Sequence, residues 1–142
     1  MIKDNDLTFN ASNKRYYLTE NYVYNKLGTD LALITFDEFD TNLSTIKART
    51  IEYACDMLYD FIEDNAVNRM ATLYDFTQRE EAHEALKKAL GYQLLFFIQV
   101  GDTSTEVDAK VSNSVSNRAI QVLKANDCFH IIRRVPKDVG EW

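Results

Sequence analysis

Glycine, proline and cysteine are scarce in this chain, with four, one and two residues respectively in a total of 142. Tight turns depend on glycine and proline, so their scarcity argues against an all-β sandwich and favours helices. The two cysteines, Cys55 and Cys128, are too few and too far apart for a disulfide framework and fit a reducing compartment. The longest apolar run, from Leu94 to Ile98, is far too short to cross a bilayer, so we expect no membrane partner.

Basic residues are also few. The chain has 16 lysines and arginines against 22 aspartates and glutamates, a formal net charge of −6. Proteins that hold nucleic acid cluster their cations, whereas the largest basic group here is Arg133 and Arg134 with Lys137 nearby. The charge therefore argues against stable DNA binding. Because the segment from Met1 to Asp6 has no apolar signal core, we also expect an intracellular product.

Apolar residues at helical spacing predict two long helices. The first runs from about Asp37 to Asp64, and the second runs from Gln78 to Val100. Thr77 and Glu80 have the spacing of a capping box, which indicates that the second helix opens there. One face of the first helix carries charged residues and is expected to be a solvated edge: Arg49, Glu52, Asp56, Asp60 and Glu63.

The segments before and between these helices have weaker signals. Residues 1–13 are polar and unpatterned, and we expect them to be mobile unless a partner orders them. After them, a short helix can open at Thr19 and stop at Gly28, or a strand can start around Tyr16–Leu18. Residues 65–76 are predicted to be a connection with a short helical turn. Four apolar residues of this connection are expected to pack beneath it: Val67, Met70, Leu73 and Phe76.

The last third of the chain is predicted to contain an extended loop, a short helix and a short strand. Serine occupies every second position in an extended loop: Ser112, Ser114 and Ser116. Ser116 can cap a short third helix, Asn117–Ala125. The alternation from Cys128 to Val135 is typical of a short strand. The overall prediction is a mainly α single domain over residues 1–142, with 1–13 and 137–142 as flexible or partner-ordered tails.

No motif in the sequence indicates a catalytic or metal site. Cys128 and His130 would share one face of a strand, but a zinc site needs four ligands and no second cluster is present. The carboxylates between Asp56 and Asp64 are better explained as a solvated helix face. The serines lack a partner histidine and a nucleophile elbow, and the four glycines form no phosphate-binding loop. We therefore expect no enzymatic activity, no cofactor and no metal.

A longer stretch of the chain carries a family resemblance. The helical run from Glu81 to Gln93 continues into an apolar end, Val100-Gly101, an acidic-polar loop, the alternating serines and the segment from Ser116 to Leu123. This order resembles the head–tail connector proteins of tailed bacteriophages, also called adaptor or head completion proteins. In that family a helix ending in Gln, aromatic and apolar residues and then Gly leads through a serine-rich segment to a short capped helix. The resemblance covers roughly Tyr16 to Val135.

The resemblance implies a small helical subunit that forms a ring of about a dozen copies in the neck of the virion, made in the host cytoplasm. Such a ring binds the portal protein on one side and the next tail or stopper protein on the other. It continues the DNA channel, and genomic DNA passes through it without specific binding. An acidic wall suits that role, because it offers no cations to replace the counterions of DNA.

The predicted interface comprises a helix end that is apolar all round, the serine segment and the C-terminal segment. Its residues are Leu94, Leu95, Phe96, Phe97, Ser112, Ser114, Ser116, Phe129, Ile131, Ile132, Arg133, Arg134 and Trp142. The alternative function is a small acidic intracellular adaptor or regulatory protein. It would bind another protein through the same helix end and act as a monomer or dimer.

Overall fold

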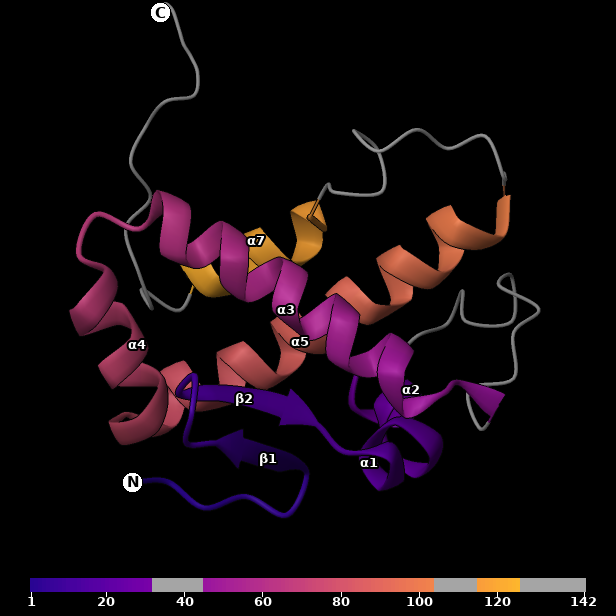
Figure 1. Cartoon of the computed structure of the whole chain (residues 1–142), viewed down its shortest axis with the longest axis horizontal. Coiled ribbons are helices and arrows are strands. Elements are labelled where there is room, and N and C mark those ends of the chain that lie inside the picture. The colour runs from indigo at the N-terminus through magenta and orange to yellow at the C-terminus, as the bar shows by residue number, and fades with distance from the viewer. Residues whose placement is uncertain (32–44, 104–114, 126–142) are drawn as a thin grey trace, which may run out of the picture.

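The computed structural model describes residues 1–31, 45–103 and 115–125, and it is mainly helical with one small sheet (Figure 1). The two long helices are α3 (Ala48–Asn65) and α5 (Glu80–Thr103), and α7 (Asn117–Ala125) is the short helix that packs along α5. The predicted mainly α fold class is therefore confirmed. The predicted C-terminal strand and most of the serine-rich loop fall outside the described residues.

The N-terminal segment forms an antiparallel hairpin of β1 (Leu7–Asn10) and β2 (Arg15–Leu18). The expectation that residues 1–13 lack ordered structure was wrong. Their alternating pattern is too short to stand out in the sequence, and the strand is stabilised by pairing with β2 and by contacts to distant helices. A strand at Tyr16–Leu18 and a helix opening at Thr19 were alternatives, and the structure contains both.

Two very short helices follow the hairpin, α1 (Glu20–Asn25) and α2 (Leu27–Asp30). The side chain of Thr19 accepts a hydrogen bond from the backbone N–H of Tyr22 at 3.1 Å, which is the N-cap interaction that the sequence predicted. Gly28 does not stop the helix as predicted, because it lies inside α2.

Helix α3 starts later than predicted. Lys47 is extended, with φ −81° and ψ 152°, and the helix begins at Ala48 rather than at Asp37. Residues 37–44 lie outside the described part of the chain. The apolar spacing continues upstream of Lys47, but periodicity alone does not show where the backbone leaves the helix.

The connection between the long helices is itself a helix, α4 (Arg69–Gln78), capped by the side chain of Asn68, which accepts a hydrogen bond from Ala71 N at 3.0 Å. The predicted capping box at Thr77 is wrong. Thr77 lies in α4, and its hydroxyl donates backward to the carbonyl of Tyr74 at 2.7 Å. The chain becomes extended at Arg79, and α5 begins at Glu80.

Helix α5 lies at the centre of the core. In Figure 1 the hairpin lies on one side of it and α7 on the other. The N-terminus of α7 is fixed by Ser116, whose Oγ accepts from Ala119 N at 3.2 Å and whose own N–H donates to the buried Gln93 side chain at 2.8 Å. The predicted cap at Ser116 is confirmed. The largest fully buried side chains come from nearly every element: Tyr16, Tyr22, Leu27, Ile51, Leu58, Tyr59, Ile62, Phe76, Leu86, Leu90, Leu94 and Leu123.

Candidate protein-binding groove

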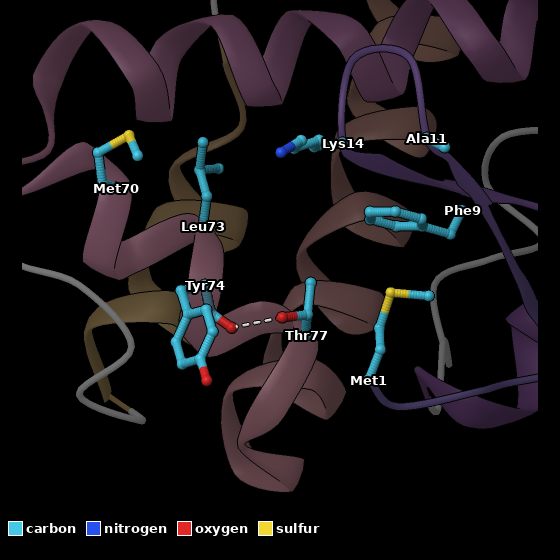
Figure 2. A pocket seen from close by; sticks show the side chains of 8 residues that line it. All are labelled: Met1, Phe9, Ala11, Lys14, Met70, Leu73, Tyr74 and Thr77. Carbon is cyan, nitrogen blue, oxygen red and sulfur yellow. Dashed lines mark hydrogen bonds between the residues drawn. The ribbon is translucent and has the colours of Figure 1, made fainter.

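An open groove of about 400 Å³ lies between the N-terminal hairpin and α4 (Figure 2). Its lining is mostly apolar: Met1, Phe9, Ala11, Lys14, Met70, Leu73, Tyr74 and Thr77. Its volume lies in the range of about 300–1,000 Å³ that is usual for pockets that bury a small molecule or side-chain cluster. We call this surface the hairpin–α4 groove.

One wall of the hairpin–α4 groove is formed by α4, which has apolar residues on two faces. Thr72 and Phe76 face inward and are 5% and 1% exposed. Met70 and Tyr74, also four residues apart, face outward and are 73% and 64% exposed. Helical spacing therefore places a second apolar face on the protein surface, where nothing in the described part of the chain covers it.

The prediction that the apolar residues of the 65–76 segment pack beneath it holds for only part of the set. Phe76 is buried and Leu73 is partly buried against the core. Val67 is 63% exposed, and Met70 is more exposed still. A regular helix cannot direct all of its apolar residues to one side unless they share a face, and these do not.

The opposite wall comes from the hairpin. Phe9 packs on Tyr16 with their ring centroids 4.9 Å apart, so its side chain is held against the core while one side faces the groove. In the turn, Asn10 accepts hydrogen bonds from Ser12 N at 2.8 Å and, through its carbonyl, from Lys14 N at 2.7 Å. These bonds fix the turn that carries Lys14.

Lys14 supplies the only charged side chain among the lining residues that the structure describes. Its φ of 62° is in the left-handed region, which disfavours residues other than glycine and asparagine. Figure 2 shows its side chain pointing from the turn toward Leu73. Lys14 makes no ion pair with any residue in the described part of the chain, so its ammonium group is available to a ligand.

The hairpin is attached to α3 through Arg15. Its guanidinium lies 2.8 Å from Asp56, 2.8 Å from Asp60 and 3.2 Å from Glu63, and it also stacks 5.3 Å from the centroid of the Tyr59 ring. Burial alone disfavours the charged form, but the hydrogen bonds to the three carboxylates outweigh it and raise the pKa of Arg15. The face of α3 that was predicted to be a solvated edge therefore binds the hairpin.

The segment before the hairpin is attached to α5 by a second charged cluster. Asp4 lies 2.8 Å from the ammonium group of Lys87 and 3.0 Å from Nε2 of His83, and Asp6 lies 3.3 Å from Lys87. Burial alone would raise the pKa of Asp4, but hydrogen bonds from Lys87, the backbone N–H of Asp6 and His83 lower it. The other ring nitrogen of His83 faces the carbonyl of Phe76 at 3.1 Å.

The structure places the predicted interface residues in different environments. Leu94 and Leu95 are 0% and 5% exposed, so they belong to the core of the chain itself and cannot serve as a surface. Phe96 and Phe97 are half-buried, and the ring of Phe97 packs edge-on against Tyr53 with centroids 5.3 Å apart. Ser116 is buried as a helix cap. The rest lie outside the described residues: Ser112, Ser114, Phe129, Ile131, Ile132, Arg133, Arg134 and Trp142.

The described residues offer little for catalysis or metal binding. Cys55 is fully buried, and burial raises the pKa of its thiol to about 12, which removes the thiolate needed for reaction at neutral pH. Within residues 1–31, 45–103 and 115–125, no group of three or more His, Cys, Asp or Glu side chains could hold a metal ion. In the same ranges, no helix is long and apolar enough to cross a membrane.

The groove could be foreseen only in part from the sequence. Met70, Tyr74 and Thr77 are spaced as one helical face, so an apolar face on α4 was readable once a helix was assigned there. The other wall was not readable, because residues 1–13 carry no clear pattern. Comparisons of the chain with protein families, with curated proteins and with solved structures found no match.

Proposed function

We propose that this protein is a structural assembly subunit, a head–tail connector of a tailed bacteriophage that works by binding other protein subunits and not by catalysis. The observation that supports protein binding is the exposed apolar lining of the hairpin–α4 groove, with Met1 59%, Met70 73% and Tyr74 64% exposed. Contiguous apolar surface of this kind on a soluble protein is typical of interaction sites. Methionine and tyrosine suit such a surface, because both give large contact area with little polar cost.

The groove is built on a prearranged support. Arg15 binds three carboxylates of α3, and Asp4 and Lys87 link the N-terminus to α5, so the hairpin wall is tied to the core before any partner binds. A surface that is already ordered loses less conformational entropy on binding than a flexible one. This arrangement favours an assembly role, in which the same contact is repeated many times.

The connector form of the proposal rests on the resemblance of the stretch from Glu81 to Asp127. It describes a ring of about a dozen copies between the portal protein and the next tail or stopper protein, in the neck of the virion. The net charge of −6 suits a ring through which DNA passes, because an acidic wall does not retain phosphate groups.

The second candidate function is a small acidic adaptor that binds one protein partner as a monomer or dimer. The same groove favours it, since an apolar groove with a single cation can also receive a peptide segment. The two candidates differ in their oligomeric state and in the genes that surround them.

Native mass spectrometry of the purified protein over a wide concentration range tests the proposal. A closed ring of about a dozen subunits is the expected result. A discrete dimer at every concentration would contradict the connector function and favour the adaptor. If only monomer is found, the encoding genome decides: a gene between portal or capsid genes and tail genes supports the connector, and a gene elsewhere contradicts it.

The Met70→Glu variant tests whether the contact between ring subunits uses the hairpin–α4 groove. Met70 is so exposed that the substitution leaves the fold intact, but it puts a charge into the apolar lining. We expect it to weaken assembly, whereas Val67→Glu, at a position that is 63% exposed and outside the lining, should have no effect. Equal assembly of both variants would show that the ring contact lies elsewhere.

A further inference from the structure

We propose that the hairpin–α4 groove of one copy receives the C-terminal residues of a second copy of this chain, with the indole of Trp142 in the apolar lining and the carboxylate of Glu141 near Lys14. The inference rests on the proposed assembly role of this groove and names the segment that fills it. The occupant is a segment that lies outside the described residues, and three observations favour it over another protein.

The first observation is charge. Among the described residues of the lining, Lys14 has the only charged side chain, and it has no ion pair with any described residue. The C-terminal sequence Val139-Gly140-Glu141-Trp142 places one carboxylate directly beside one large aromatic side chain. A groove with one cation at the edge of an apolar surface is complementary to that pair. The ammonium group can also interact with the face of the indole ring.

The second observation is the chemistry of the lining. Met1 and Met70 provide thioether sulfurs, and Tyr74 and Phe9 provide aromatic rings. Methionine sulfur makes favourable contacts with aromatic rings, and aromatic pairs add to the energy of burial. Figure 2 shows these side chains on both sides of the hollow, with Phe9 opposite Leu73 and Met70. An indole can contact both walls at once.

The third observation is reach. Helix α7 ends at Ala125, and the chain continues for 17 residues to Trp142. A chain of that length spans at most about 60 Å when fully extended. A globular chain of this size has a radius of gyration of about 14 Å, so the segment is long enough to reach the groove of a neighbouring copy.

The test uses the fluorescence of Trp142, which is the only tryptophan in the chain and therefore reports on this residue alone. In the full-length protein we expect emission shifted to the blue of N-acetyl-tryptophanamide and acrylamide quenching that is several-fold weaker. In Lys14→Glu and in Met70→Glu, the emission should move toward that of the free compound and quenching should increase. Lys88→Glu and Val67→Glu are the controls, at exposed positions outside the lining, and they should behave as wild type.

A charge exchange separates the salt bridge from unspecific effects. Glu141→Lys alone should expose the indole, and the double variant Lys14→Glu with Glu141→Lys should restore the shielded emission. Circular dichroism of each variant verifies that the helices remain. Native mass spectrometry of the same samples then assigns the source: shielded emission only where oligomers are present supports docking on a second copy, and shielded emission in a purely monomeric sample would place the docking within one chain and overturn the proposal.

Two further results would overturn the inference. One is a wild-type Trp142 that is as accessible to acrylamide as the free compound at every concentration. The other is a shielded Trp142 that does not respond to Lys14→Glu, Met70→Glu or the charge exchange, which would place it in another site. Either result leaves the ring proposal standing, since native mass spectrometry tests that separately.

Discussion

The ammonium group of Lys87 lies 2.8 Å from a carboxylate oxygen of Asp4, and this contact joins the first residues of the chain to the first half of α5. Both side chains are largely buried, with 10% and 12% of their surface exposed. The pair therefore fixes the segment that leads into the hairpin, and with it one wall of the groove. A terminus held in this way behaves as part of the core.

We expect Asp4→Asn to lower the free energy of unfolding by about 1–3 kcal/mol, because the neutral amide removes the charge that pairs with Lys87 and has only one acceptor oxygen for Lys87, His83 and the backbone N–H of Asp6. Urea denaturation monitored by circular dichroism measures the change. Asp64→Asn is the matched control, since Asp64 is exposed and has no ion pair among the described residues, and it should stay within about 0.5 kcal/mol of wild type. Equal effects at the two positions would contradict a role for Asp4.

Acid should destabilise the protein through the same carboxylate. The pKa of Asp4 is held below its ordinary value of 3.8 in the folded state, so the unfolded chain binds the proton more readily. The stability that this group contributes is present above pH 3.8 and is lost as the pH falls through the lower, folded pKa. Unfolding free energies measured between pH 7 and pH 2.5 should fall less steeply for Asp4→Asn than for wild type in the acid range. If the unfolding free energies of wild type and Asp4→Asn fall in parallel with pH, Asp4 is not the group whose protonation destabilises the fold.

Removal of Arg15 should loosen the hairpin. Arg15→Ala leaves Asp56, Asp60 and Glu63 close together without a cation, and we expect a loss of about 2 kcal/mol, a value reduced from that of a fully buried cluster because Asp60 is 66% exposed. The free energy of unfolding of Arg15→Lys should lie between those of wild type and Arg15→Ala, since lysine keeps the charge but lacks the planar guanidinium that binds several carboxylates at once.

Hydrogen exchange should localise that effect to β1 and β2, whose amides should lose protection before those of α5. Arg69→Ala is the control, because Arg69 is exposed and unpaired within the described residues. If the amides of β1 and β2 exchange at the same rates in Arg15→Ala and Arg69→Ala, the ion pairs of Arg15 do not hold the hairpin.

Gly28 and Gly91, which both lie in helices, should respond with opposite signs to alanine. A Cβ at Gly28 would meet no atom within 4 Å, so Gly28→Ala should stabilise by about 0.5–1 kcal/mol through helix propensity. A Cβ at Gly91 would lie 2.6 Å from Leu27 Cδ1 and 3.2 Å from Leu31 Cδ1. We expect overpacking of about 1–3 kcal/mol to exceed the propensity gain of about 1 kcal/mol, so Gly91→Ala should destabilise. Thermal unfolding of both variants tests this, and stabilisation by both would show that Leu27 can move.

Cys55 should be unreactive in the folded protein. Its thiol is fully buried, and its pKa is raised to about 12. In a Cys128→Ser background, a thiol reagent at pH 8 should label the protein only after denaturation. Rapid labelling of the native protein would reopen the possibility of cysteine chemistry.

The predictions of local structure from the sequence were correct where the interacting groups lie within one short segment. Thr19 and Ser116 cap helices because each has a side-chain oxygen within reach of a backbone N–H three residues on. Thr77 has the same local chemistry, yet its hydroxyl bonds backward to Tyr74. The difference is that α4 continues through Thr77 and the chain turns only at Arg79, a position set by how α4 and α5 pack.

By itself, the sequence determined the helical character of the chain, its acidic charge and most of its helix caps, because these follow from composition and from contacts within one turn of helix. The hairpin–α4 groove, the attachment of Asp4 to Lys87 and the binding of Arg15 to α3 were decided only by the tertiary structure. Each of them joins side chains that are far apart along the chain. Spacing in a sequence tells which residues share a face of one element, whereas packing decides which faces meet and which remain open to a partner.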